Sequence, residues 1–342
     1  MTVASRPRAA VIGCGAISAS HLRFLNASTD VDLVAVCDAS PSVGRYAVEA
    51  FGAPQSFTDA EEMLAKASPE VVHVLTPPAT HQALIELALK AGAHVYCEKP
   101  ITFTAAELEH VQRLARERAL RCIEGHNYRF NNQIRKLDSL ISSGALGEIH
   151  WVGLDLAVPM PDSDLGAPGG ALHDYITHAS YLALHYLGDR SFDDVRARWA
   201  LVGDDPGPRY NDLTAVVGAG KACASIRISG SPRPFCFRIN LRGTAGGAET
   251  DLFQPYLHVE REDRDAPLRP LTDQAANGAR LIAASGRNFC EKVLQHSPLH
   301  GLERLLGLFY ESIATGGPSP VTDGQVMATS RLIDAIVAEA SS

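Results

Sequence analysis

Short apolar runs alternate with helical patterns in the first part of the chain. The runs are nearly continuous and rich in branched residues, which is typical of strands buried on both faces of a parallel sheet. They lie at residues 9–12, 33–37, 71–75 and 94–97. The segments between them carry apolar residues three and four positions apart, as amphipathic helices do. These segments are 20–25, 43–51, 60–67 and 81–91. A helix at 105–118 and a strand near 120–124 complete a predicted doubly wound, parallel α/β domain.

The pattern changes after this region. Longer, partly alternating runs joined by turn-rich stretches predict a large, mostly antiparallel sheet. They lie at 149–157, 213–217, 222–229 and 235–242. One strong helix is expected at 171–187, and from about residue 275 the pattern is helical again, with a break at 316–320. We therefore predict two domains, a doubly wound α/β domain at 1–124 and a second α/β domain with a large sheet at 125–342.

Composition narrows the class of protein. With 342 residues, 46% of them hydrophobic and 20% charged, the chain is expected to fold into about two globular domains. Its net charge of −8 argues against partners held by a basic field, namely nucleic acid or an anionic membrane surface. Seven scattered cysteines form no C-x-x-C pair, and neither a signal peptide nor a transmembrane run is apparent. We expect a soluble cytoplasmic protein with reduced thiols.

The first strand leads into a glycine turn that is typical of dinucleotide binding. Gly13 and Gly15 allow a tight turn whose backbone N–H groups approach a pyrophosphate, and Ala16 and Ile17 lead into the helix whose N-terminus attracts the anion. The third position of the fingerprint is Ser18 rather than glycine. Asp38 ends the second strand, where a carboxylate accepts hydrogen bonds from the adenosine ribose and repels a 2′-phosphate. NAD is therefore favoured over NADP.

Two further strand ends are expected to border the cofactor, because ligands of open α/β sheets lie beyond the carboxyl ends of the strands. Thr76, Pro77 and His81 follow one strand, and His81 either touches the cofactor or caps the next helix. Glu98 and Lys99 follow another. An ammonium at Lys99 would stand near the nicotinamide and hydrogen-bond a substrate oxygen. Taken alone, this charged pair is better explained as a surface salt bridge.

The helix at 171–187 carries the titratable residues that chemistry would need. At 100° per residue, Asp174, His178, Tyr181 and His185 fall within about 60° of one another, opposite an apolar face that includes Ile176. A carboxylate one turn from an imidazole suits a proton carrier, whereas the alternative is a solvated polar face. No third ligand is spaced to join Asp174 and His178, so no metal is expected. The sequence contains no G-x-S-x-G elbow, so a Ser-His-Asp hydrolase is a poor fit.

Together these motifs resemble those of the Gfo/Idh/MocA oxidoreductases, the group of glucose–fructose oxidoreductase and inositol 2-dehydrogenase. The resemblance covers nearly the whole chain. Its landmarks are the G-x-G turn, Asp38, the segment 76–81, the tripeptide Glu98-Lys99-Pro100, the segments 125–130 and 144–149, the G-G-A-L-x-D-x-x-x-H helix, and segments 242–244 and 318–326. The family fold is a Rossmann domain followed by an α/β domain whose sheet often supports dimers or tetramers.

The resemblance also implies roles. Lys99 would bind the reacting oxygen, His178 would exchange its proton, and Asp174 would orient His178 or bind a neighbouring hydroxyl. Tyr128 and Arg129 fall in a segment that borders the substrate pocket in relatives. Two positions depart from the family helix D-x-G-x-H-x-x-D: Ile176 replaces the glycine, and Tyr181 replaces the last acid. Tyr181 is therefore expected to alter substrate contacts.

The resulting prediction is an NAD-dependent oxidoreductase that acts on CH–OH groups. It would transfer hydride between nicotinamide and a carbinol carbon of a sugar, sugar acid, inositol or related cyclitol. One alternative is redox-assisted glycoside cleavage, with Tyr181 or His185 as an extra base. Another is a nucleotide sensor without catalysis, which has no need of Lys99, Asp174 and His178 together. A substrate carboxylate could be received by Arg129, Arg227 or Arg233.

Overall fold

The computed structural model describes residues 6–159, 171–188, 192–202, 210–231, 233–262, 266–294 and 300–341. The chain forms two compact units, and each unit combines one long segment with a second, shorter segment from the C-terminal part of the chain. Unit 1 comprises Met1–His126 and Leu302–Ser330, and unit 2 comprises Asn127–Gly301 and Arg331–Ser342. Residues 302–330 therefore belong to unit 1. The division of function between residues 1–124 and 125–342 stays a prediction.

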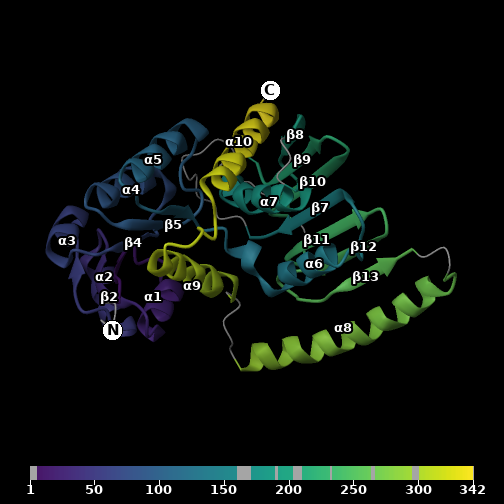
Figure 1. Ribbon diagram of the computed structural model, residues 1–342, viewed down its shortest axis with the longest axis horizontal. Helices are drawn as coiled ribbons and strands as arrows, with labels where there is room; N and C mark the ends of the chain where they lie inside the picture. The colour runs from purple at the N-terminus through teal and green to yellow at the C-terminus, as the bar shows by residue number, and fades with distance from the viewer. Residues whose placement is uncertain are drawn as a thin grey trace. The chain divides into compact units, whose positions relative to one another are not determined.

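Unit 1 is built on a six-stranded parallel sheet with the order β3-β2-β1-β4-β5-β6 (Figure 1). The strands are β1 Arg8–Ile12, β2 Asp32–Cys37, β3 Ser56–Phe57, β4 Val71–Val74, β5 His94–Cys97 and β6 Cys122–Glu124. The strand order reverses between β1 and β4, which is the point at which open α/β sheets bind ligands. The predicted parallel sheet is confirmed, and the sequence missed only the two-residue strand β3.

Helices follow these strands as the hydrophobic periodicity predicted. They are α1 Ser18–Ala27, α2 Pro41–Phe51, α3 Ala60–Ala67, α4 His81–Lys90 and α5 Ala105–Glu117, with the short 3₁₀ helix η1 Pro78–Thr80 before α4. Side-chain caps fix two of the starts, because Asp59 accepts from the Glu62 N–H and Thr104 forms a capping box with Glu107.

Two C-terminal helices, α9 His300–Thr315 and α10 Asp323–Ala340, flank the predicted break. Most of α9 belongs to unit 1, where the side chain of Phe309 is fully buried. The Arg116 guanidinium on α5 also pairs with Asp323 at the start of α10 at 3.0 Å. The Rossmann core of unit 1 is thus completed by residues from the end of the chain.

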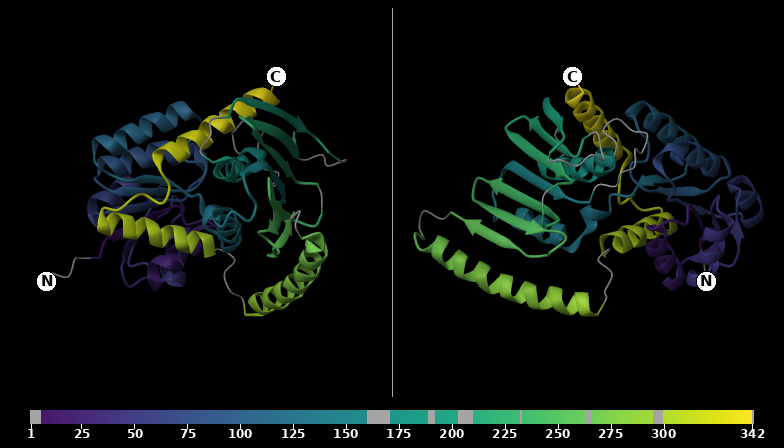
Figure 2. Two further views of the ribbon diagram at one scale, coloured as in Figure 1. Left: turned by 45° about the vertical axis from the view of Figure 1, so that its right-hand side comes forward. Right: turned by 180° about the vertical axis from the view of Figure 1, so that it is seen from behind.

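Unit 2 contains a seven-stranded mixed sheet with the order β13-β12-β11-β7-β10-β9-β8 (Figure 2). The strands are β7 Ile149–Ala157, β8 Asp194–Ala200, β9 Asp212–Ala219, β10 Ala222–Ser229, β11 Cys236–Gly243, β12 Gly246–Asp251 and β13 His258–Arg261. Every pairing is antiparallel except that of β7 with β10, which confirms the predicted mostly antiparallel sheet. The sequence interpretation did not identify β8, β12 or β13.

Four helical segments accompany this sheet: η2 Asn127–Phe130, α6 Asn132–Ser142, α7 Ala171–Leu187 and α8 Arg269–Val293. The prediction of α7 at 171–187 is confirmed, and α7 packs on β7 and β10. The long helix α8 runs along the sheet beside β13 (Figures 1 and 2). Among the described residues, no helix is both long enough and apolar enough to cross a membrane.

Candidate functional site

The glycine turn after β1 has the backbone shape that a bound pyrophosphate needs. Gly13 adopts a φ of +93°, and a Cβ built on it would lie 2.8 Å from backbone atoms of Leu75 and Thr76, so no other residue fits there. A Cβ on Gly15 would meet nothing within 4 Å, which leaves space above the exposed turn. Ser18, at the third fingerprint position, is buried and donates its hydroxyl to the Gly15 carbonyl at 2.6 Å.

Asp38 lies beside this turn at the carboxyl end of β2. Its Oδ2 accepts from the Cys14 N–H at 2.8 Å, and its Oδ1 accepts from the Ser40 N–H at 2.8 Å. Each oxygen still has a second lone pair for a ribose hydroxyl. The open space over Gly15, the exposed Ala16 and the half-buried Ile17 at the helix start, and this anchored carboxylate fit an NAD molecule.

The strand-end segment at 76–81 divides into an accessible part and a buried part. Thr76 is half-buried and accepts a hydrogen bond from the Thr80 hydroxyl at 2.7 Å, and Pro77 is exposed. The imidazole of His81 is fully buried between the Pro100 carbonyl, 2.8 Å from Nδ1, and the Thr76 carbonyl, 2.7 Å from Nε2. Burial lowers the pKa of His81. Of the two alternatives for His81, this geometry favours a structural tie between loops.

The segment Glu98-Lys99-Pro100 is held in place by several neighbours. Glu98 Oε1 lies 3.4 Å from His21 Nε2 and also accepts from the Tyr96 hydroxyl at 3.4 Å. Burial would raise the pKa of Glu98, but the His21 hydrogen bond and the Lys99 charge bring it below its ordinary value. Glu124 accepts the Ile101 N–H at 2.8 Å just beyond the cis Lys99–Pro100 bond. The half-buried Lys99 therefore stands on a fixed loop.

Behind Glu98 runs a buried chain of hydrogen bonds that the sequence did not predict. His21 Nδ1 lies 2.9 Å from His73 Nδ1, and His73 Nε2 lies 2.8 Å from the Tyr310 hydroxyl. Burial and the neighbouring His21 hold the pKa of His73 well below its ordinary value, so His73 is neutral. One arrangement then satisfies every contact: Tyr310 donates to His73, His73 donates to His21, and His21 donates to the Glu98 carboxylate.

In unit 2, the structure brings His178, Tyr181 and Tyr128 together. The Tyr181 hydroxyl lies 2.9 Å from His178 Nδ1, accepts the Tyr128 N–H at 3.2 Å, and donates to Asn127 Oδ1 at 3.4 Å. The Tyr128 ring packs edge-on against the His178 ring, with centroids 4.7 Å apart. The imidazole is thus fixed by two elements, α7 and η2. Arg129, also on η2, is half-buried.

The stripe predicted along α7 requires a correction. His178 and Tyr181 are buried, as is Ile176 on the opposite face, because η2 covers the side that the sheet does not. The solvated-face alternative is therefore wrong for the middle of the helix. His185 does not join the cluster by any hydrogen bond described, since its Nε2 pairs with Asp138 of α6 at 2.8 Å. Asp174 is half-buried in the first turn of α7.

A separate cavity of about 1100 Å³ lies in unit 2 between α6, the segment after β12, and the end of α8. Arg135, Lys136, Arg287 and Lys292 line it together with Glu291, so its charge is mainly positive. Burial and the charge of Arg287 lower the pKa of Lys136. None of its lining residues is among the predicted catalytic ones.

Several residues of the two clusters have no marker in the sequence. His21 and His73 interrupt apolar patterns without a motif, and Tyr310 lies more than 200 residues away from His73 along the chain. Asn127 lies next to Tyr128, within the segment 125–130 that carried the resemblance, and this proximity is the one signal that could have identified it.

The fold and the glycine turn are those of a Rossmann-type dinucleotide-binding domain, and comparisons with known proteins identify its relatives. Residues 7–126 match the GFO_IDH_MocA model, described as an oxidoreductase family with an NAD-binding Rossmann fold. The inositol 2-dehydrogenase of Rhizobium meliloti is 26% identical over 77% of this chain and 81% of its own length. The myo-inositol 2-dehydrogenase of Thermotoga maritima is 26% identical over 93% and 92%, respectively.

Structural similarity extends over both units. The WlbA dehydrogenase of Bordetella pertussis, solved with NADH and UDP-GlcNAcA, superposes with a TM-score of 0.80 at 18% identity and covers 99% of this chain and 96% of its own. These comparisons support the resemblance that the motifs indicated, and the family model itself covers residues 7–126. The matched residues form a Rossmann domain of the kind that this NAD-binding oxidoreductase family shares.

Proposed function

We propose that this protein is an NAD-dependent dehydrogenase or reductase of a small polyhydroxylated substrate: a sugar, a sugar acid, an inositol or a related cyclitol. The single observation that carries the proposal is the fixed imidazole of His178, whose Nδ1 lies 2.9 Å from the Tyr181 hydroxyl. The relatives named as inositol dehydrogenases support the substrate class. The seven thiols support a cytoplasmic location, and the relatives' family supports a homo-oligomer.

The hydrogen bonds around Tyr181 suit a proton carrier. When Tyr181 donates to Asn127 Oδ1, its oxygen accepts the Nδ1–H of His178, and Nε2 is then the basic nitrogen that takes a hydroxyl proton. The resulting imidazolium keeps the same Nδ1–H bond, so the hydrogen bonds need no rearrangement when the proton moves. In the reducing direction, Nε2–H returns the proton to the carbonyl oxygen.

The remaining residues have supporting roles in this proposal. Lys99 stabilises the developing alkoxide, and Asp174 with Tyr128 and Arg129 binds substrate hydroxyls or a carboxylate. Bound NAD accepts or supplies the hydride. Gly13, Gly15, Ala16 and Ile17 bind its pyrophosphate, Asp38 binds its adenosine ribose, and Thr76, Pro77 and Glu98 border it. Asp38 favours NAD over NADP because its negative charge repels a 2′-phosphate.

The test is NADH formation with NAD and a panel of polyols, aldoses, sugar acids and cyclitols, with products analysed in parallel. The proposal expects one compound class to produce NADH. His178→Ala and Lys99→Ala should each lower kcat by at least about 100-fold, the usual share of acid–base catalysis, with NAD affinity nearly unchanged. Cleaved product without NADH would instead indicate redox-assisted cleavage. NAD binding without any product from the panel would favour the sensor, and loss of NAD binding in both variants would contradict the assigned roles.

A further inference from the structure

Helix α8 presents its apolar side outward. Seven of the twelve large apolar residues that are exposed in the described part of the chain lie between positions 268 and 294. Ile282 is 77% exposed and Phe289 is 70% exposed. A surface helix normally turns its apolar stripe toward its own core. Here the usual arrangement is inverted.

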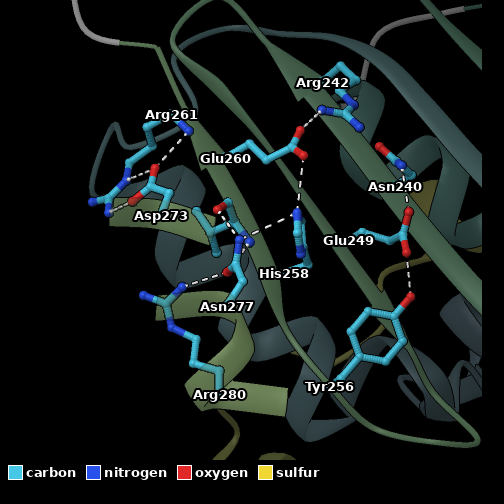
Figure 3. A network of polar contacts seen from close by, with 11 residues as sticks. Asn240, Arg242, Glu249, Tyr256, His258, Glu260, Arg261, Asp273, Asn277 and Arg280 are labelled. Atoms are coloured by element: carbon cyan, nitrogen blue, oxygen red, sulfur yellow. Dashed lines mark hydrogen bonds and ion pairs between the residues drawn. The ribbon is translucent and has the colours of Figure 1, made fainter. Parts of the chain in front are cut away.

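The side of α8 that faces its own sheet is polar (Figure 3). Asp273 pairs with the Arg261 guanidinium at 2.6 Å, and Asn277 exchanges two hydrogen bonds with the backbone of Val259, at 2.8 and 3.0 Å. Farther along, Asn288 donates to the Pro255 carbonyl at 2.9 Å. Directional bonds therefore hold α8 on β13 and the segment before it, and its apolar surface is left for another partner.

The outward stripe has a symmetric spacing. Its members repeat every three or four residues on one side of the helix, with no charged residue among them. They are Leu271, Ala275, Gly278, Ile282, Gly286, Phe289 and Val293. The intervals between them read 4, 3, 4, 4, 3, 4 in either direction, with Ile282 at the centre. An antiparallel copy of the same helix would therefore place every member of the stripe opposite another member.

The side chains match across such a pairing. Leu271 would lie opposite Val293 of the second helix, and the small Ala275 opposite the large Phe289. Gly278 would lie opposite Gly286, and Ile282 would meet itself on a two-fold axis. This is the self-complementary pattern of an isologous dimer contact. Contact with an unrelated partner would not require a symmetric spacing of apolar residues in this sequence.

The two glycines are a second, independent observation. Glycine inside a helix costs about 1 kcal/mol relative to alanine. A Cβ built on Gly278 or Gly286 meets nothing within 4 Å, so no neighbour in the chain requires glycine there. Close approach of a second helix backbone would require it.

We infer that the α8 stripe is a two-fold interface with a second copy of this chain, formed by antiparallel packing of two α8 helices about Ile282. Four members of the stripe, Leu271, Ile282, Phe289 and Val293, are large apolar residues that are exposed in the single chain and that this contact would bury. The resemblance implies oligomers supported by the sheet of the second domain, and the α8 stripe is a further contact surface outside that sheet.

The first test measures mass by light scattering and sedimentation at micromolar concentration. Ile282→Glu places two like charges on the two-fold axis and should halve the mass of the wild-type assembly. Tyr46→Glu, which adds the same charge at another exposed apolar residue, should leave the mass unchanged. Far-ultraviolet circular dichroism confirms that each variant is folded. A monomeric wild type, or an Ile282→Glu variant of unchanged mass, would overturn the inference.

A second test separates assembly from folding. Gly278→Leu should raise or preserve thermal stability of the isolated chain, because the site is open and leucine favours helices. The same change should weaken the assembly at least tenfold, since its side chain meets Gly286 of the other copy. Gly307→Leu is the matched control, because Gly307 is an equally open and exposed glycine inside α9. Equal effects of both variants on the mass would contradict a contact at α8.

A third test fixes the register. Ile282→Cys in a Cys290→Ser background should form an intermolecular disulfide under mild oxidation, because the two-fold axis brings both copies of position 282 together. Ala276→Cys in the same background lies about 120° around the helix and should remain uncrosslinked. An intact assembly in which the Ile282→Cys variant forms no crosslink would exclude the proposed register.

Discussion

The hydroxyl of Tyr181 lies 2.9 Å from Nδ1 of His178, one turn away on the same helix. The pattern D-x-G-x-H-x-x-D, which this helix resembles, has an acid at this position, and here a phenol stands in its place. A carboxylate at Nδ1 would hold a full negative charge next to the imidazole, whereas the hydroxyl is neutral and can either donate or accept. The substitution therefore keeps the ring oriented and leaves its tautomer to the Asn127 and Tyr128 contacts.

Removing that hydroxyl should slow the reaction without abolishing it. Tyr181→Phe leaves His178 Nδ1 and the Tyr128 N–H without this partner, and a net hydrogen bond of about 1–1.5 kcal/mol corresponds to roughly a tenfold loss in kcat. The KM for NAD should change little. Tyr175→Phe is the control, since it removes a hydroxyl from the same helix that bonds only the Pro159 carbonyl among the contacts described. A kcat within twofold of wild type in Tyr181→Phe would show that the phenol does not position the imidazole.

Asp38 should set the preference for NAD. In Asp38→Ala, the turn loses the acceptor for the Cys14 and Ser40 N–H groups, and the cofactor loses its ribose acceptor. Hydrogen bonds to a charged group contribute about 1.5–3 kcal/mol, so the KM for NAD should rise roughly 10- to 100-fold. The KM for NADP should change less or fall, because a repulsive charge is removed. The measurement is steady-state kinetics with both cofactors, and Asp30→Ala, at an exposed acid, is the control. A parallel rise of the KM for NAD and the KM for NADP in Asp38→Ala would show that Asp38 does not discriminate between them.

The sequence predicted the fold where local pattern and tertiary packing agree. The strands β5, β7 and β10 and the helices α3 and α7 have the predicted ends, since apolar runs or caps mark them. The two-residue strand β3, the edge strands β8 and β13 and the neighbouring strand β12 were missed because pairing with neighbours, rather than their own hydrophobicity, makes them strands.

The candidate site was predictable to the extent that its residues belong to motifs. Gly13, Asp38, Lys99 and His178 lie in segments whose spacing carries information. The contact between His73 and Tyr310 joins positions 237 residues apart, and no periodicity encodes such a pair. Burial of the α7 stripe was unpredictable for the same reason, because η2 covers it only in the folded unit.

The buried chain from Tyr310 to Glu98 should behave as a coupled unit. Tyr310→Phe removes the hydrogen-bond partner of His73 Nε2. His73→Leu removes a hydrogen-bond partner from both the Tyr310 hydroxyl and His21 Nδ1. Each change should lower the free energy of unfolding by about 1–3 kcal/mol. The double variant should lose less than the sum of the two, with a coupling of at least about 0.5 kcal/mol in urea unfolding experiments. Strict additivity would show that the chain is not a connected network.

Two buried histidines and one half-buried histidine should make the protein less stable in mild acid. Burial lowers the pKa of His73, His81 and His94, with His21 adding to the effect on His73 and Arg121 to that on His94. Below the ordinary value of 6.5, the unfolded chain binds protons that these folded imidazoles do not. The free energy of unfolding should therefore be constant with respect to these groups above pH 6.5 and fall as the pH drops below it. Each group contributes up to about 1.4 kcal/mol per pH unit.

The decisive measurement is the slope of the unfolding free energy between pH 6.5 and 5.5, obtained from urea titrations. In this window the carboxylates with lowered pKa values, such as Glu98 and Asp273, do not yet contribute, because their stabilisation is lost only at more acidic pH. His73→Gln keeps a polar side chain but cannot titrate, so it should reduce the fall in unfolding free energy between pH 6.5 and 5.5 by about 1 kcal/mol. His150→Gln, at an imidazole that is 46% exposed, is the matched control. Equal slopes for wild type and His73→Gln would show that His73 accepts a proton in the folded protein, and the neutral arrangement assigned to the buried chain would then be wrong.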